Sequence, residues 1–143
     1  LMLLTLRETR AVENDLPVAV IGAGPVGLAA VARLLERGMT PLLFEAGARV
    51  GANLLDYGHV PLFSPWRYNI DATMATMLTA NGWQAPPADL LPPAGDVVTR
   101  VLEQFAALPA VAAHLHLNTR VLAITRPAGE AGSAAARVWA SCP

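Results

Sequence analysis

The chain has 143 residues, of which 54% are hydrophobic and 15% are charged, and its net charge is −1. This length and apolar content suit one globular domain with a hydrophobic core and exclude a disordered chain. The ten basic residues are spread along the sequence, so we expect neither a nucleic-acid interface nor a membrane-binding basic helix. Cys142 is the only cysteine, which excludes a disulfide within one chain and makes a reducing, cytoplasmic location the expectation.

The first regular segments predict a strand, a helix and a second strand. Val18–Ile21 is a short β-branched run typical of a buried parallel strand. After a glycine-rich turn, apolar residues at helical spacing predict a helix that ends near Gly38, and Pro41–Phe44 predicts the second strand. The uncharged stretch Pro17–Ala32 is too short and too interrupted by glycine to span a membrane. This β-α-β unit predicts an α/β, Rossmann-like domain with a parallel sheet and flanking helices.

Three further elements follow this unit. Asp71 is expected to cap a short helix that runs to Ala80. A second helix is expected to begin at a cap formed by Asp96, to carry an apolar stripe and to stop at Pro109. Alternation over Leu115–Ile124 predicts one strand. We therefore divide the chain into a loose leader at residues 1–16, a Rossmann-like domain at residues 17–126 and a weakly ordered tail at residues 127–143.

The turn after the first strand matches the pattern G-x-G-x-x-G, with Gly22, Gly24 and Gly27 in the three glycine positions. In this pattern the first glycine permits a tight exit from the strand, the second lets a pyrophosphate approach the backbone, and the third allows close helix–strand packing. The helix N-terminus offers unpaired N–H groups to phosphates, and Pro25 fits its first turn. The segment therefore predicts a site for the ADP half of a dinucleotide.

Glu45 is the second element of this site, 18 residues after Gly27 at the end of the second predicted strand. An acid at this position reaches the adenosine ribose hydroxyls, and its charge opposes a 2′-phosphate, so NADP is disfavoured here. The alternative explanations are a simple turn and an exposed strand-end carboxylate. The combination of strand, helix and spacing argues against both.

The residues after Glu45 indicate FAD. Glu45-Ala46-Gly47-Ala48-Arg49-Val50-Gly51-Ala52 matches E-x-x-x-x-x-G-G, except that Ala52 replaces the second glycine. Together with the glycine turn, this segment resembles the bacterial two-dinucleotide-binding-domain flavoproteins similar to flavin-containing monooxygenases and thioredoxin reductases. The resemblance implies an FAD-binding portion whose cofactor-binding residues are Gly22, Gly24, Pro25, Gly27, Glu45, Ala46, Gly51 and Val121.

Two later segments extend the resemblance. Asn118-Thr119-Arg120-Val121 resembles the strand whose valine backbone meets the adenine in these flavoproteins, which is why Val121 is included. Residues 57–69 resemble a stretch in uncharacterised bacterial members of the group, and its position implies a place near the flavin ring. Within that stretch, Trp66 and Arg67 are either flavin or substrate contacts or a packed aromatic and a solvated charge.

The resemblance implies an oxidoreductase in which NAD(P)H delivers hydride to the flavin, which passes electrons to an unknown acceptor or oxygen. The only later candidate for an NAD(P)H fingerprint, Gly129-Glu130-Ala131-Gly132, follows no predicted strand. We therefore expect an incomplete flavin domain that lacks a C-terminal half and has little NAD(P)H turnover alone. An NAD-binding dehydrogenase domain and a non-catalytic nucleotide-binding module remain alternatives.

Other reactive side chains form no site that the sequence can assign, so no catalytic residue is predicted. His114 and His116 would share a face of the last predicted strand, but no third ligand is near, so we expect a surface pair and no metal. Ser64 lacks the G-x-S-x-G context of a nucleophile. The absence of a dithiol argues against thioredoxin-reductase chemistry in this segment.

Overall fold

The structure, a computed structural model, describes residues 16–125 and 136–142. Residues 1–15 of the expected leader at 1–16 and the glycine pair at 129–132 lie outside the described residues. The elements in chain order are β1 (Val18–Ile21), α2 (Pro25–Glu36), β2 (Pro41–Phe44), α3 (Ala52–Leu55), α4 (Trp66–Asn69), α5 (Ala72–Ala80), α6 (Ala94–Val97), the π-helical turn η1 (Val98–Leu102), α7 (Glu103–Ala106), α8 (Pro109–Ala112), β3 (Leu115–His116), β4 (Arg120–Thr125) and β5 (Arg137–Ser141).

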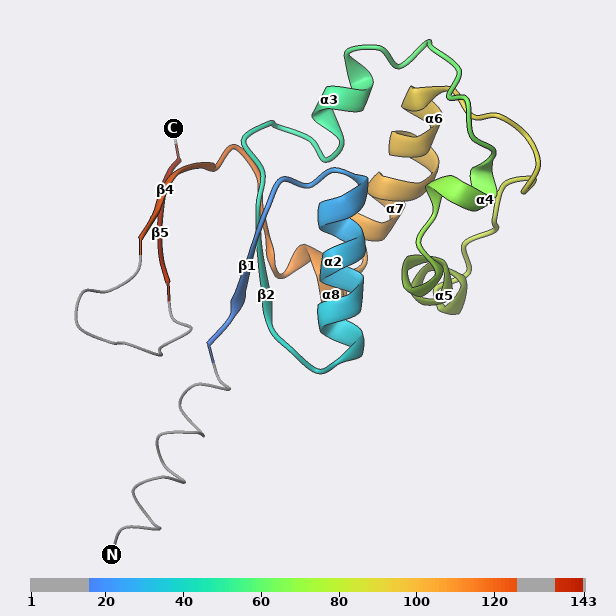
Figure 1. Cartoon of the computed structure of the whole chain (residues 1–143). Helices are drawn as coiled ribbons and strands as arrows, with labels where there is room; N and C mark the ends of the chain where they lie inside the picture. The colour runs from blue at the N-terminus through green and yellow to red at the C-terminus, as the bar shows by residue number, and fades with distance from the viewer. Residues whose placement is uncertain (1–15, 126–135, 143) are drawn as a thin grey trace, which may run out of the picture.

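The strands form two separate sheets. β1, β2 and β3 make a parallel sheet in that order, and β4 pairs with β5 in an antiparallel ribbon. In Figure 1, α2 and the helices behind it lie on one side of the parallel sheet, and the ribbon lies on the other side. The predicted α/β, Rossmann-like class is therefore confirmed.

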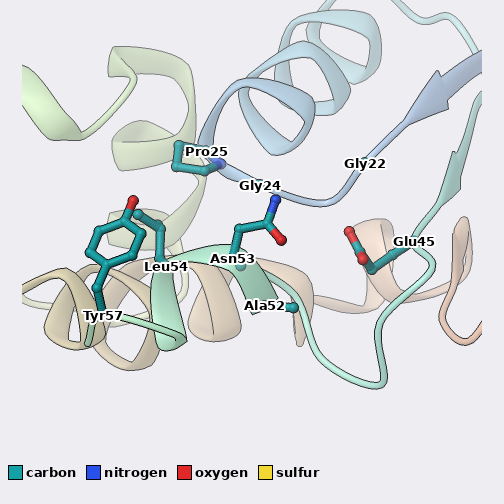
Figure 2. A pocket seen from close by; sticks show the side chains of 9 residues that line it. Gly22, Gly24, Pro25, Glu45, Ala52, Asn53, Leu54 and Tyr57 are labelled. Carbon is teal, nitrogen blue, oxygen red and sulfur yellow. The ribbon is translucent and has the colours of Figure 1, made fainter.

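The β1-α2-β2 unit occupies the segments that the sequence predicted. Gly38 adopts a left-handed conformation with φ 69°, directly after the last turn of α2, and ends that helix as expected. α2 packs against both strands and buries Leu28, Val31 and Ala32. Each buried Leu or Val side chain contributes about 1.5–3 kcal/mol, so this face fixes the helix on the sheet. The two strands end at one edge of the sheet, where Gly22 and Glu45 follow them (Figure 2).

β1 is less buried than the sequence predicted. Val18 and Val20 are half-buried, but Ala19 and Ile21, which point to the opposite face, are exposed, with Ile21 51% exposed. The apolar run Val18–Ile21 suited a strand covered on both faces. Within the described residues, the helices cover only one face of the sheet, and this is the reason for the difference.

The second long helix is present, but it is divided and starts earlier than expected. It begins at Ala94 after an extended proline, so Asp96 lies inside the first turn and is not the cap. Pro109 ends this run and opens α8, because the residue before a proline is driven out of helical conformation. The predicted apolar stripe is confirmed, and η1 and α7 bury most of it: Val98, Val101, Leu102 and Phe105.

The prediction of one strand over Leu115–Ile124 is wrong. Asn118 adopts a left-handed conformation with φ 51°, which short polar side chains tolerate, and turns the chain between β3 and β4. His114 precedes β3, so it does not share a strand face with His116. His116 instead stacks on Phe44, with ring centroids 5.5 Å apart. β5 lies within the segment expected to be weakly ordered.

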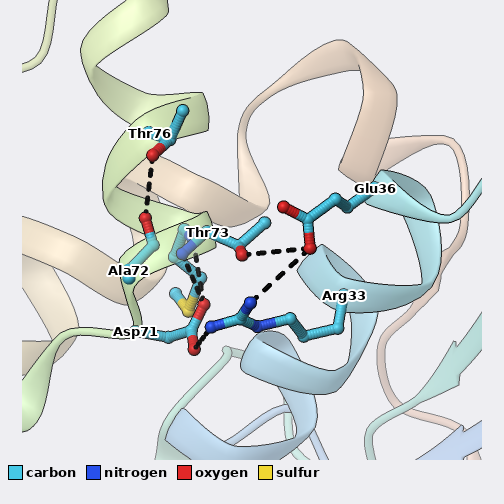
Figure 3. Close-up of polar contacts among 7 residues, drawn as sticks. Arg33, Glu36, Asp71, Ala72, Thr73 and Thr76 are labelled. Atoms are coloured by element: carbon cyan, nitrogen blue, oxygen red, sulfur yellow. Dashed lines mark hydrogen bonds and ion pairs between the residues drawn. The ribbon is translucent and has the colours of Figure 1, made fainter.

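Asp71 joins α5 to α2 through a small polar cluster (Figure 3). Its carboxylate accepts hydrogen bonds from the N–H groups of Thr73 and Met74 at 2.9 and 3.1 Å, which confirms the predicted cap. Its other oxygen accepts a hydrogen bond from Arg33 on α2 at 3.0 Å. Burial raises the pKa of the Asp71 carboxyl, but these three hydrogen bonds outweigh it, and the pKa lies below its usual value.

Replacing Asp71 with alanine should lower the free energy of unfolding by about 1 kcal/mol at neutral pH, because two helix N–H groups lose their acceptor. The lowered pKa means that this stabilisation is complete well above pH 4 and declines as the pH falls through the folded-state pKa. Urea unfolding at pH 7 and pH 3 measures both effects. The difference between the natural protein and Asp71→Ala should shrink at pH 3.

Asp89→Ala is the control, because the Asp89 side chain is 83% exposed and pairs only with the exposed Arg67. It should change the unfolding free energy by less than about 0.5 kcal/mol. An Asp71→Ala effect of the same size at both pH values would contradict the assigned charge state.

Candidate nucleotide-binding site

A cavity of about 280 Å³ opens at the carboxyl ends of β1 and β2. In open α/β sheets, ligands bind in the crevice at this edge. Its volume is near the lower end of the roughly 300–1,000 Å³ usual for small-molecule pockets, so it suits part of a dinucleotide. The residues that line it are Gly22, Gly24, Pro25, Glu45, Gly51, Ala52, Asn53, Leu54 and Tyr57.

Glycine occupies the three positions of the turn for three different structural reasons. Gly22 has φ 94°, a conformation that side chains rarely adopt. A Cβ on Gly27 would lie 1.8 Å from the carbonyl oxygen of Gly22, so only glycine permits this approach of α2 to β1. A Cβ on Gly24 would meet no protein atom within 4 Å, and Gly24 lines the cavity. Gly24 therefore leaves the cavity open instead of relieving a contact inside the protein.

The N-terminus of α2 supplies hydrogen-bond donors at this opening. Pro25 occupies the first turn, no side chain caps the helix, and no acidic residue lies in its first turn. The N–H of Leu28 already donates to the carbonyl oxygen of Gly24 at 3.0 Å. The N–H groups of Val26 and Gly27 precede it, so they have no acceptor within the helix. A phosphate at this position would accept from them and meet the positive end of the helix dipole.

The Glu45 carboxylate is held by two backbone groups. One oxygen accepts a hydrogen bond from Ala23 N–H at 2.7 Å, and the other accepts one from Gly47 N–H at 2.7 Å. An ionised carboxylate has about four acceptor positions, so both oxygens can still accept from a ligand hydroxyl. The carboxylate lines the cavity at the end opposite to Tyr57, with Gly24, Pro25 and Asn53 between them (Figure 2).

Gly51 fixes the loop that forms the floor of the cavity. It has φ 66°, and a Cβ there would lie 2.8 Å from a methyl group of Val98. Its N–H donates to the carbonyl oxygen of Ala23 at 2.9 Å, which ties this loop to the glycine turn. The methyl group of Ala52 is accommodated because Gly47, which it faces, has no side chain. Alanine in place of the second glycine is therefore compatible with this turn.

The structure brings together five of the eight predicted cofactor-binding residues in the cavity lining. Gly27 acts behind the cavity, in helix packing, and Ala46 is exposed just after β2. Val121 lies on β4, paired with Ala140 of β5, and does not line the cavity. For all eight residues, contact with a cofactor stays a prediction.

Four lining residues were not predicted as cofactor-binding: Ala52, Asn53, Leu54 and Tyr57. The nearby Gly51 was the available signal, since α3 begins directly after it. Tyr57 opened the stretch expected near the flavin ring. Of the two residues left open in that stretch, Trp66 is buried with the Arg100 guanidinium over its ring, and exposed Arg67 pairs with Asp89. Neither lines the cavity.

Residues 16–125 and 136–142 contain no cluster of three or more side chains suited to a metal ion. The same part of the chain has no helix long and apolar enough to cross a membrane.

The fold is that of a Rossmann-like domain with a cavity at the carboxyl ends of its parallel strands. Residues 20–85 match the family model described as the NAD(P)-binding Rossmann-like domain. This match covers the second half of β1, all of α2 and β2, and every residue that lines the cavity. No curated protein matches the sequence significantly.

Several solved structures share this fold. OTEMO in complex with FAD and NADP (form 1) matches with a TM-score of 0.64 and 23% identity, over 89% of this chain and 22% of that chain. An oxidized steroid monooxygenase bound to NADP matches with a TM-score of 0.59 and 23% identity, over 76% and 20% of the two chains. Bacillithiol disulfide reductase Bdr (YpdA) from Bacillus cereus matches with a TM-score of 0.58 and 21% identity, over 88% and 34%. The chain thus spans about a fifth to a third of these proteins.

Alanine substitutions at Gly27 and Gly24 test the different reasons for glycine at these two positions. Gly27→Ala should lower the unfolding free energy by about 3 kcal/mol, because the new methyl group would overlap the Gly22 carbonyl. Gly24→Ala should change it by less than about 1 kcal/mol, because its methyl group points into open space. The same methyl group should weaken ADP binding by about tenfold or more, since it occupies the phosphate position.

Denaturant unfolding and calorimetric titration with ADP measure the two effects. Equal losses of stability in both variants would contradict the close approach at Gly27. Unchanged ADP affinity in Gly24→Ala would remove Gly24 from the phosphate position.

Proposed function

We propose that this chain is the FAD-binding domain of a flavin-dependent oxidoreductase that takes hydride from NAD(P)H. The observation that carries the proposal is the convergence on one cavity of the open glycine turn, the uncapped N-terminus of α2 and the Glu45 carboxylate. These groups suit, respectively, the close approach of a pyrophosphate, its negative charge and the hydroxyls of a ribose.

Two observations favour FAD over NAD at this cavity. The E-x-x-x-x-x-G segment begins directly after β2, and its last residue, Gly51, is left-handed and packs against η1. The solved structures that share the fold include OTEMO complexes with FAD. The negative charge of Glu45 also opposes a 2′-phosphate, which FAD lacks. NADP therefore fits this cavity less well than FAD.

The order of groups along the cavity gives the cofactor a direction. With the ribose at Glu45 and the pyrophosphate at α2, the rest of the dinucleotide must extend towards Tyr57 and Leu54, at the opposite end. For FAD, that distal part is the ribityl chain and the flavin ring. An aromatic and an aliphatic side chain suit such a group because the ring is flat and largely apolar.

FAD, when bound, supplies the electron-transfer chemistry, and the protein residues bind and orient it. In this proposal α2 and Gly24 hold the pyrophosphate, Glu45 holds the adenosine ribose, and Tyr57 contacts the distal half. Hydride delivery from NAD(P)H, the electron acceptor and a monooxygenase-like reaction belong to the proposed whole protein, of which this chain spans a part. A cytoplasmic location remains a prediction from the single cysteine.

The absorbance spectrum of the purified chain with added FAD, after removal of free cofactor, tests the proposal. Retained flavin should show bands near about 370 and 450 nm, which belong to the flavin ring itself. Gly24→Ala should retain less. A chain that binds NAD and not FAD would support the NAD-binding alternative and overturn the proposal. A chain that binds neither would overturn both.

Replacing Tyr57 with alanine tests the direction of the cofactor. Loss of the ring should weaken FAD binding by about tenfold, since an aromatic contact and its buried area are worth about 1–2 kcal/mol. ADP binding should stay within about twofold, because ADP ends at the pyrophosphate. Calorimetric titration of both ligands gives the comparison. Tyr68→Ala, at another exposed tyrosine outside the cavity lining, is the control. Equal losses for ADP and FAD would contradict the proposed direction.

A further inference from the structure

The two oxygens of Glu45 bind different segments of the chain. Ala23, which donates to one of them, lies in the glycine turn after β1. Gly47, which donates to the other, lies in the loop after β2. Both distances are 2.7 Å, at the short end of the range for an N–H donor and a charged acceptor. The carboxylate is therefore a bridge between the two loops that border the cavity.

The backbone of Ala23 is held at both of its peptide groups. Its N–H donates to Glu45, and its carbonyl oxygen accepts from Gly51 N–H at 2.9 Å. Ala23 is fully buried between the two glycines that face the cavity, Gly22 and Gly24. The orientation of these two successive peptide groups therefore affects where Gly24 and the start of α2 lie.

The backbone around Glu45 is fixed independently of its side chain. Glu45 N–H donates to the carbonyl oxygen of His116 at 2.9 Å, and its own carbonyl oxygen accepts from Thr119 N–H at 2.8 Å. Asn118 N–H donates to the carbonyl oxygen of Gly47 at 2.9 Å. The carboxylate thus projects from a rigid base, the end of β2 and the turn after β3, towards the more open glycine turn.

We propose that Glu45 is a positioning residue for the phosphate-binding turn, in addition to contacting the ribose. Its carboxylate orients the Ala23 peptide, and through it the donors that meet the pyrophosphate. This inference rests on the proposed nucleotide site and assigns a second task to one of its residues. It implies that Glu45 contributes to the binding of a nucleotide that has no ribose hydroxyls.

The direction in which dideoxy-ADP affinity changes when Glu45 is replaced distinguishes a positioning role from contact with the ribose alone. If Glu45 only contacted the ribose, its loss would not weaken the binding of 2′,3′-dideoxy-ADP. Removing its negative charge would even favour that anion, because like charges repel. If Glu45 positions the turn, the affinity for dideoxy-ADP falls despite the lost repulsion.

Glu45→Gln is the informative variant, since the size is kept and only one side-chain oxygen can still accept. Its amide nitrogen must face a backbone N–H, either Ala23 or Gly47, and that hydrogen bond is lost. Calorimetric titration of the full chain should show about a tenfold loss of affinity for dideoxy-ADP and a larger loss for ADP. Asp56→Asn is the matched control, because it removes one exposed negative charge next to the cavity-lining Tyr57; it should leave both affinities equal or slightly higher.

Unchanged or tighter dideoxy-ADP binding by Glu45→Gln, with weaker ADP binding, would overturn the positioning role and keep the nucleotide site. No ADP binding by the natural chain would instead overturn the proposed function. If the variant does not fold, amide hydrogen exchange of the natural chain tests the bridge instead. Amide hydrogen exchange should be slow at Ala23 and Gly47, and rapid exchange at both would show that the bridge is absent in solution.

Discussion

The fold depends on the contact of one backbone with another, at the point where α2 crosses the end of β1. The space between Gly22 O and the Cα of Gly27 admits no methyl group, so the helix lies as close to the strand as a peptide chain can. This approach brings the helix N-terminus to the edge of the sheet. Leu28, Val31 and Ala32 then bury their side chains against the sheet and the neighbouring helices, which makes the position of the terminus rigid. A rigid N-terminus can present N–H donors to an anion without reorganisation.

The loops at that edge are joined mainly by backbone groups. Ala23 connects the turn after β1 to Gly51 and, through the Glu45 carboxylate, to Gly47. Buried or partly buried peptide groups must find partners, and here they find them in adjacent loops. The same hydrogen bonds that satisfy the backbone therefore shape the cavity. Glycine is required at Gly51 for a packing reason as well, since its neighbour across the loop is the buried Val98 on η1.

The sequence was sufficient for the β1-α2-β2 unit and for five cavity residues, because local spacing and conformation determine them. Gly38 and Asp71 end and begin their helices as predicted, and both act on residues within four positions. Predictions failed where distant contacts or single turns decide. Asn118 divides the expected strand through a left-handed conformation that alternation does not reveal. Asp96 is not the cap because the helix begins at Ala94, two residues before Asp96. Tyr57 joins the cavity through α3, whose short length gives little periodicity.

In the proposed site, the groups that would bind the pyrophosphate of any dinucleotide differ from those that would select among dinucleotides. At that site, Gly24 and the N–H groups of α2 would accept any pyrophosphate, because backbone donors do not distinguish the rest of a ligand. Selectivity must come from the side chains at the two ends. In the proposed site, Glu45 would favour a free ribose over a 2′-phosphate, and Tyr57 with Leu54 would offer an apolar surface to the group beyond the pyrophosphate. Since the Glu45 carboxylate also accepts from Ala23 N–H, its proposed selectivity would be coupled to the shape of the glycine turn. A substitution at Glu45 that altered the ribose preference would therefore also change the binding of the pyrophosphate, which all dinucleotides share.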